Sequence, residues 1–154
     1  MAVPLSMTAH GPNQSRAIYF AGSIRGGRDD AAIYGELIEK LRQFGHVHTE
    51  HIGSPSLTDG GEAGSAREIH DRDLDWLRSS DFIVAEVTTP SLGVGYEIAR
   101  ATEWGKKVLC LFRRKNDIKG LSAMIAGCPE VVVREYETVP DTDAILADFF
   151  TEPR

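Results

Sequence analysis

Apolar residues follow two alternating patterns along the chain. Short apolar runs are typical of buried strands, and apolar residues that recur every three or four positions are typical of helices that pack one face against a core. The short runs predict five strands, at 17–21, 46–52, 81–87, 107–112 and 131–136. The periodic segments predict five helices, at 29–44, 66–79, 92–104, 121–126 and 141–150.

The alternation of strands and helices determines the expected fold class. Strands connected through helices make right-handed crossovers, which place them in a parallel sheet covered by helices on both faces. We predict a single three-layer α/β domain with a mostly parallel five-stranded sheet over 16–154, after a flexible lead-in at 1–15. Ligands bind outside the carboxyl ends of such strands, where the strand order reverses. Functional residues are therefore expected in the loops after Phe20, Val87 and Phe112.

The composition narrows the class of ligand. The 154 residues are 42% hydrophobic and 26% charged, as in a soluble globular domain, and the net charge is −6. This charge disfavours binding to nucleic acid or to a membrane surface, but not the binding of one small phosphorylated ligand in a local site. The spacing of Cys110 and Cys128 fits neither a zinc site nor a disulfide framework. We therefore expect reduced thiols, a cytoplasmic or nuclear location, and no metal or other cofactor.

The loop after the first predicted strand has the composition of an anion site. It carries three glycines, a serine and two arginines, in the order Gly22-Ser23-Ile24-Arg25-Gly26-Gly27-Arg28. Glycines let the backbone approach an anion closely, and arginine can bind a phosphate through two parallel N–H donors. The loop matches neither the dinucleotide fingerprint nor the P-loop. A solvated turn is the structural alternative, but the position after the first strand favours a phosphate or sugar site.

Glu97 is the candidate nucleophile, in the helix that follows the third predicted strand. Ser91 and the amides near Gly93 lie where this helix begins, and the helix dipole favours a negatively charged ligand there. Glu97 follows about one turn later among apolar neighbours, and we expect the same dipole to keep it ionised. An ionised, partly buried carboxylate beside a cavity is suited to attack an anomeric carbon. A glutamate that only stabilises its helix is the alternative.

Asp73 is the candidate proton donor. It interrupts an apolar stripe formed by Ile69 and Trp76 on one face of a predicted helix. Apolar surroundings disfavour the charged form of a carboxyl group, which suits a proton donor, although pairing with a nearby arginine or capping of a loop is an equal alternative. Two carboxyl groups in one pocket are typical of glycoside cleavage, in which one attacks the sugar and the other assists the leaving group. Here the leaving group would be a base.

Other polar residues carry weaker signals. His46, His48 and Glu50 alternate along a predicted strand and so resemble a row of metal ligands, but a solvated strand face is the more common origin of this pattern. His51 is expected on the opposite face, where an approach to the edge of the pocket and a packing or hydrogen-bonding role are both open. Ser122 lies where a loop enters a short helix, so it can contact a phosphate or simply cap the helix.

Several of these segments resemble the 2′-deoxynucleoside 5′-phosphate N-hydrolases, which belong to the wider nucleoside 2-deoxyribosyltransferase group. The matching blocks extend over 17–126 and include the 22–28 loop, Asp73-Leu74, Pro90-Ser91-Leu92-Gly93-Val94-Gly95-Tyr96-Glu97 and Leu121-Ser122-Ala123-Met124-Ile125. The resemblance implies a Rossmann-like or flavodoxin-like fold and hydrolysis of deoxynucleoside monophosphates, among them purine nucleotides and 5-hydroxymethyl-dUMP, in sanitation of the nucleotide pool. The loop at 52–65 and the chain after Ala126 depart from the vertebrate pattern, which leaves the preferred base open.

The resemblance also implies roles for individual residues. Glu97 would form a deoxyribosyl-enzyme intermediate, Asp73 would act on the leaving base, and Tyr19 would orient the glutamate and the sugar. The serine that matches Ser122 reaches the phosphate from the neighbouring subunit, so a homodimer is expected. The residues that would hold the nucleotide are Gly22, Ser23, Ile24, Arg25, Gly26, Gly27, Arg28, Ser91 and Gly93.

Three other functions use similar features. A 2-deoxyribosyltransferase would share the glutamate but pass the sugar to another base, and it would act on nucleosides that lack the phosphate. A phosphoribohydrolase of the cytokinin-activating kind would carry a Pro-Gly-Gly-x-Gly-Thr pattern, which this sequence does not contain. A non-catalytic nucleotide-binding module would not need Glu97 for its function.

Overall fold

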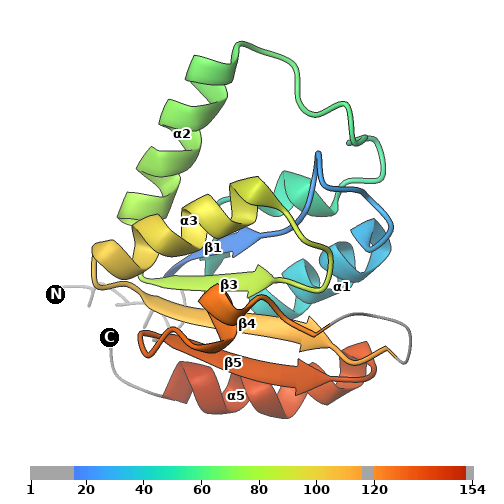
Figure 1. Cartoon of the computed structure of the whole chain (residues 1–154), viewed down its shortest axis with the longest axis vertical. Coiled ribbons are helices and arrows are strands. Elements are labelled where there is room, and N and C mark those ends of the chain that lie inside the picture. Colours follow the sequence, from blue (N-terminus) through green and yellow to red (C-terminus); the bar gives the residue numbers. More distant parts are fainter. Residues whose placement is uncertain (1–15, 116–119, 152–154) are drawn as a thin grey trace, which may run out of the picture.

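A five-stranded, all-parallel sheet in the order β2-β1-β3-β4-β5 forms the centre of the molecule (Figure 1). The computed structural model describes residues 16–115 and 120–151, so the predicted lead-in at 1–15 lies outside the described residues. The strands are β1 (Ala17–Ala21), β2 (His46–Val47), β3 (Phe82–Glu86), β4 (Lys107–Arg113) and β5 (Val131–Tyr136). The predicted α/β class with a five-stranded parallel sheet is confirmed.

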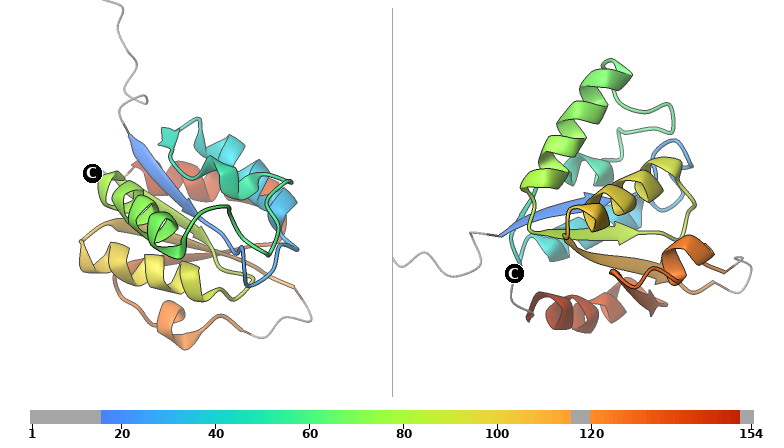
Figure 2. Two further views of the ribbon diagram at one scale, coloured as in Figure 1. Left: turned by 90° about the horizontal axis from the view of Figure 1, so that it is seen from above. Right: turned by 60° about the vertical axis from the view of Figure 1, so that its left-hand side comes forward.

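Helices cover both faces of this sheet (Figure 2). They are α1 (Ala31–Leu41), α2 (Ala66–Ser79), α3 (Leu92–Glu103), α4 (Ala123–Ala126) and α5 (Thr142–Thr151), with short 3₁₀ helices η1 (Glu50–Gly53) and η2 (Val139–Asp141). One face of the sheet packs against α1 and α5, and the other packs against α2 and α3. Successive residues of β1 alternate between the two faces, so Tyr19 belongs to the layer of α2 and α3. No helix within the described ranges is long and apolar enough to cross a membrane.

The second strand is shorter than the sequence predicts. A strand is expected at 46–52, but β2 ends at Val47 and η1 follows shortly after. The reason is Thr49, whose buried hydroxyl accepts a hydrogen bond from the amide of Phe20 at 2.8 Å and donates to the carbonyl of Phe20 at 2.6 Å. The Thr49 side chain thus takes the place of the backbone hydrogen bonds that the next residue of β2 would make with Phe20 of β1. The alternating row considered as metal ligands is interrupted here, whereas the other elements begin and end within three residues of their predicted positions.

The strand order reverses between β1 and β3, which lie side by side and lead to helices on opposite faces of the sheet. A crevice is expected at such a point. The loops after the two strands touch each other there, because Gly26 in the first packs against Pro90 in the second. A Cβ atom at Gly26 would lie 2.4 Å from the carbonyl oxygen of Pro90 and 2.8 Å from Oγ of Ser23. The two loops therefore form one continuous edge of the fold.

We predict that Gly26→Ala destabilises the protein, because the backbone of one loop must move away from the other. Overpacking of this kind lowers the free energy of unfolding by about 1–3 kcal/mol, which urea denaturation followed by circular dichroism will measure. Gly60→Ala is the matched control, since a Cβ atom there meets the Thr58 hydroxyl at 3.4 Å, an ordinary contact. Equal unfolding free energies for the two variants would show that contact between the loops does not constrain the fold.

Candidate active site

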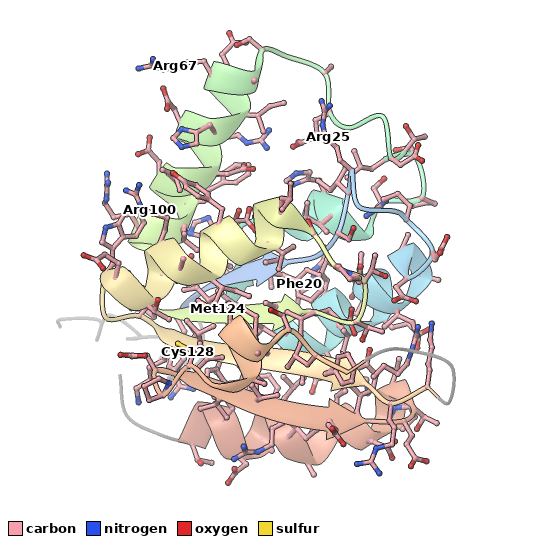
Figure 3. The ribbon with its side chains drawn as sticks, in the orientation of Figure 1. Phe20, Arg25, Arg67, Arg100, Met124 and Cys128 are labelled. Atoms are coloured by element: carbon pink, nitrogen blue, oxygen red, sulfur yellow. The ribbon has the colours of Figure 1, made fainter. Side chains whose placement is uncertain are left out.

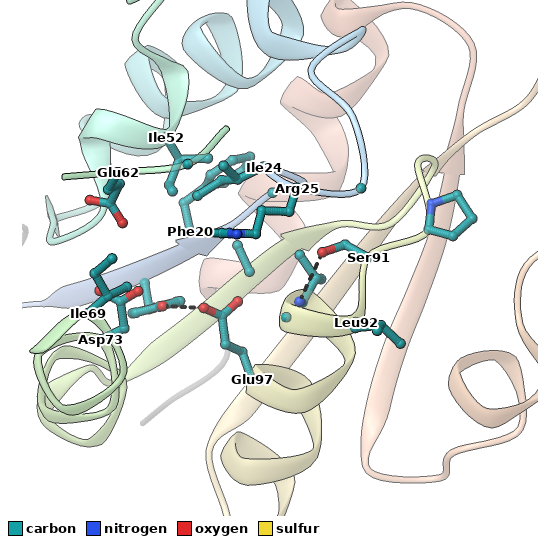
Figure 4. Close-up of a pocket in the computed structure, with 18 residues that line it drawn as sticks. Phe20, Ile24, Arg25, Ile52, Glu62, Ile69, Asp73, Ser91, Leu92 and Glu97 are labelled. Atoms are coloured by element: carbon teal, nitrogen blue, oxygen red, sulfur yellow. Dashed lines mark hydrogen bonds between the residues drawn. The ribbon is translucent and has the colours of Figure 1, made fainter. Parts of the chain in front are cut away.

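A cavity of about 450 Å³ lies at the carboxyl ends of β1 and β3 (Figure 4). Its walls come from the loops after these strands, from the beginning of α3, from α2 and from the long loop that precedes α2. The three residues proposed for chemistry, Tyr19, Asp73 and Glu97, all line it. The cavity thus occupies the place where this class of fold binds its ligands.

Glu97 is partly buried in this cavity and accepts a hydrogen bond on Oε1 from the Tyr19 hydroxyl, at 2.6 Å. Burial raises the pKa of Glu97 to about 7; the Tyr19 hydrogen bond opposes this rise and the charge of Asp73 adds to it. The expectation that the helix dipole keeps Glu97 ionised is therefore corrected. Glu97 lies in the second turn of α3, where the influence of the dipole has faded, and desolvation dominates.

The hydroxyl of Tyr19 donates the hydrogen bond that offsets part of the cost of burying the Glu97 carboxyl group. Tyr19 is almost completely buried near the end of β1, and burial together with the neighbouring carboxylates raises its pKa well above the ordinary value for tyrosine. Its hydroxyl therefore stays protonated and donates to Oε1 of Glu97. Within the described part of the chain, Oε2 of Glu97 has no hydrogen-bond partner, so that oxygen is available to a ligand in the cavity.

Asp73 reaches the cavity from α2, which rises away from the sheet (Figure 1). A capping box of Ser65 and Glu68 begins this helix. Nε and Nη2 of Arg72 donate to Oδ1 of Asp73 at 2.9 and 2.7 Å. Burial raises the pKa of Asp73, and the hydrogen bonds and charge of Arg72 oppose that rise. Both sequence-based interpretations hold at once, because Asp73 is paired with an arginine and its charged form is still disfavoured.

The structure divides the loop after β1 into two sets of residues. Those that line the cavity are Gly22, Ile24, Arg25 and Gly26, and those that do not are Ser23, Gly27 and Arg28. The guanidinium of Arg28, expected to contact the substrate, instead donates to the backbone carbonyls of Ser23, Ile52, Ser54 and Leu57. It ties the loop to the segment after β2. Oγ of Ser23 is buried and has no hydrogen-bond partner among the described residues.

Ser91 and Gly93 line the cavity, but Ser122 lies elsewhere. The Ser91 hydroxyl caps α3 by accepting from the amide of Val94 at 3.4 Å. Ser122 caps α4 by accepting from the amide of Met124 at 3.3 Å, and it lines a second hollow of about 1000 Å³ between α3 and α4. Within one chain, the described residues of the loop after β4 therefore do not contribute to the first cavity.

Glu62 is a cavity residue that the sequence does not single out. It comes from the Gly-, Ser- and Pro-rich segment between η1 and α2, whose composition indicates only a loop. Its side chain is 12% exposed, its carboxylate contacts Arg72, and Oε1 lies 2.9 Å from Nε2 of His51. His51 thus contacts a residue of the cavity wall but does not line the cavity itself. Glu62 and Asp73 lie on one side of the cavity, and Ser91 lies on the other (Figure 4).

The arrangement is suited to attack on a sugar carbon without a metal ligand set. The described ranges hold no group of three or more histidine, cysteine, aspartate or glutamate side chains placed to bind a metal ion. They do place two carboxyl groups with raised pKa values, Glu97 and Asp73, in one cavity with a tyrosine hydroxyl. One carboxyl group can act as a nucleophile and the other as a proton donor.

Comparison with known proteins shows which proteins this chain resembles. A family model for nucleoside 2-deoxyribosyltransferase matches residues 18–146. A 5-hydroxymethyl-dUMP N-hydrolase of Tetraodon nigroviridis is 52% identical over 142 residues, which cover 89% of this chain and 99% of that protein. The 5-hydroxymethyl-dUMP N-hydrolase of Homo sapiens is 48% identical over 139 residues, covering 87% and 79%. The CMP N-glycosidase BcmB of Clostridium botulinum shares the fold, with a TM-score of 0.61, 18% identity, and coverage of 87% and 99%.

We predict that the stability of the ligand-free protein depends on the ionisation of Glu97. Because the pKa of Glu97 is higher in the folded protein than in the unfolded chain, the protonated side chain favours the folded state. This contribution to the unfolding free energy is complete below the ordinary pKa of 4.5 and is lost as the pH rises through the folded value of about 7. Glu97→Gln removes this dependence. From pH 5 to pH 8, the unfolding free energy of the wild type should therefore fall by about 2 kcal/mol more than that of the variant.

Urea denaturation at these two pH values measures the difference. Glu103→Gln is the control, because Glu103 is exposed at the end of the same helix, and its difference from the wild type should not change with pH. A pH-independent difference for Glu97→Gln as well would contradict the raised pKa of Glu97.

Proposed function

The chain belongs to the nucleoside 2-deoxyribosyltransferase family, and we propose that it hydrolyses 2′-deoxynucleoside 5′-monophosphates to a free base and 2-deoxyribose 5-phosphate. The observation that carries this proposal is the Glu97 carboxyl group, held by Tyr19 in a cavity that it shares with Asp73. The relatives named 5-hydroxymethyl-dUMP N-hydrolase, which are about half identical, support both the reaction and the substrate class. We therefore take 5-hydroxymethyl-dUMP as the first substrate to test.

The first half of the reaction breaks the bond between the sugar and the base. Oε2 of Glu97 attacks C1′, the bond from C1′ to the base nitrogen breaks, and its electron pair leaves with the base. The proton held by Asp73 passes to the departing base. The negative charge of Glu97 stabilises the oxocarbenium-like transition state, while the hydroxyl of Tyr19 holds the other carboxylate oxygen in place.

The second half restores both carboxyl groups. A water molecule attacks C1′ of the deoxyribosyl ester and gives one proton to Asp73, which has become a carboxylate. The ester bond breaks, its electron pair returns to Glu97, and 2-deoxyribose 5-phosphate leaves. Each turnover therefore consumes one water molecule, and neither acid undergoes a net change.

The 5′-phosphate is placed at the end of the cavity away from Asp73. The beginning of α3 presents the Ser91 hydroxyl and the backbone near Gly93 there, and Arg25 and Gly26 line the cavity from the loop after β1. Amide donors and a positive dipole end favour an anion there. A local site of this kind accounts for phosphate binding by a chain whose net charge is −6.

A homodimer would complete the phosphate site. Leu92 and Met124 are 96% and 83% exposed beside the hollow between α3 and α4, and such exposed apolar side chains mark contact surfaces. The two cavities share Ser91 in their walls. A partner that covers this hollow can therefore bring its own Ser122 towards the beginning of α3.

Base exchange is the second candidate function, favoured by the family model itself. A transferase would use the same glutamate and the same covalent ester, but the acceptor would be another base in place of water. The two reactions differ in their products when a free base is added, and this difference decides between them.

We predict that Glu97→Gln and Glu97→Ala lower turnover at least about 10³-fold while nucleotide binding persists, because the nucleophile is lost and the phosphate contacts are not. Chromatography of the released base measures turnover, and calorimetry measures binding. Glu103→Gln, on the exposed part of the same helix, should retain wild-type turnover. Turnover of Glu97→Ala within tenfold of the wild type would instead indicate a site in which Glu97 does no chemistry.

We predict that 5-hydroxymethyl-dUMP is cleaved at least about 100-fold faster than its nucleoside, because phosphate binding energy is used in the transition state.

Arg25→Ala and Ser122→Ala should lower kcat/KM for the nucleotide about tenfold and leave the nucleoside rate unchanged. Arg67→Ala is the control, since Arg67 lies at the outer end of α2 (Figure 3). Equal rates for nucleotide and nucleoside would refute the phosphate site, and base exchange in place of sugar phosphate release would refute hydrolysis.

A further inference from the structure

Arg72 does not line the cavity, yet it contacts two carboxylates that do. Its Nη2 donates to both oxygens of Glu62 at 2.9 Å. The same nitrogen donates to Oδ1 of Asp73 at 2.7 Å, and Nε donates to that oxygen at 2.9 Å. Glu62 belongs to the loop before α2 and Asp73 to α2 itself. One guanidinium therefore joins the loop to the helix on the side of the cavity assigned to the leaving base.

The guanidinium of Arg72 is itself held in place. It lies over the ring of Trp76, 4.6 Å from the ring centroid, where the ring attracts a cation. The rings of His48 and His51 pack near the same tryptophan, with centroids 6.3 and 5.9 Å away. The Arg72 side chain is only 34% exposed. It is part of a packed layer rather than a mobile surface arginine.

We propose that Arg72 is a positioning residue for the leaving-group end of the cavity. By binding Glu62 it fastens the 54–65 loop against α2, and by occupying Oδ1 of Asp73 it leaves Oδ2 to face the base. The proposal rests on the proposed function, because it concerns the proton that Asp73 gives to the base. Arg72 acts through the two acids, and its role is to set their orientation and charge balance.

Arg72 and Glu62 act on Asp73 in opposite directions. Burial raises the pKa of Asp73, Arg72 lowers it by hydrogen bonds and charge, and Glu62 raises it by charge. The ionisable groups that face Asp73 are Arg72, Glu62, His51, Tyr19 and Glu97. Loss of Arg72 should therefore raise the pKa of Asp73, and loss of the Glu62 charge should lower it. A loop that merely came loose would expose Asp73 to water and lower its pKa in both variants.

The direct test is titration of Asp73 in the ligand-free protein, followed by carbon-13 NMR of its carboxyl group. Arg72→Gln should raise the pKa and Glu62→Gln should lower it, whereas Arg72→Lys, which keeps the charge, should stay near the wild type. Arg67→Gln is the matched control, because it removes the same charge from an exposed pair with Asp71 on the same helix. Shifts in one common direction for Arg72→Gln and Glu62→Gln, or no shift, would overturn the proposal.

Hydrolysis of 5-hydroxymethyl-dUMP separates this proposal from the proposed function. Arg72→Gln should lower kcat about tenfold with a smaller change in KM, since a misplaced proton donor affects the transition state more than substrate binding. Arg72→Lys should restore part of the loss. A wild type that releases no base would overturn the proposed function and leave the NMR comparison valid. An active wild type with Arg72→Gln and Arg67→Gln equally active would overturn the role of Arg72 alone.

Discussion

The hydrogen bond from Tyr19 to Glu97 is the interaction on which the candidate site depends. A carboxyl group removed from water needs a partner, and the Tyr19 hydroxyl supplies one at 2.6 Å. Tyr19 lies in β1, which is paired on both sides, so its position is fixed by the sheet. Burial and this hydrogen bond act in opposite directions on Glu97, and the balance brings its pKa to about 7. One carboxylate oxygen is thereby held, and the other is the oxygen that we propose attacks the sugar.

The remaining parts of the site are arranged around this pair by the fold. The reversal of strand order opens the crevice, and close packing of Gly26 on Pro90 joins the two loops that border it. The guanidinium of Arg28 donates to the backbone carbonyls of Ser23 and Ile52 and so ties the loop after β1 to the segment after β2. The result is one cavity lined by the beginning of α3 and by the side chains of Glu62, Asp73 and Glu97, in which we propose that the phosphate of a nucleotide lies away from Asp73.

The pattern of apolar and polar residues along the chain predicts both the class of fold and the two catalytic candidates, because both are visible as local sequence patterns. The strands appear as short apolar runs, and Glu97 and Asp73 appear as acids that interrupt apolar helix faces. Features that depend on tertiary contacts are not visible in this way. The end of β2 is set by the bond between Thr49 and Phe20, and the ionisation of Glu97 by its burial. Glu62 lies in a loop without periodicity, so only the folded chain shows that it faces the cavity.

We propose that Glu97 forms a covalent bond to the sugar, and intact-protein mass spectrometry can detect this bond. A 2′-fluoroarabinosyl nucleoside monophosphate is a suitable probe, because its fluorine destabilises the oxocarbenium-like transition state and slows hydrolysis of the ester. We expect the acid-quenched wild type to carry one sugar phosphate on the peptide that contains Glu97, and the Glu97→Gln variant to carry none. Base release by the wild type without any such adduct, or an adduct on another residue, would contradict it.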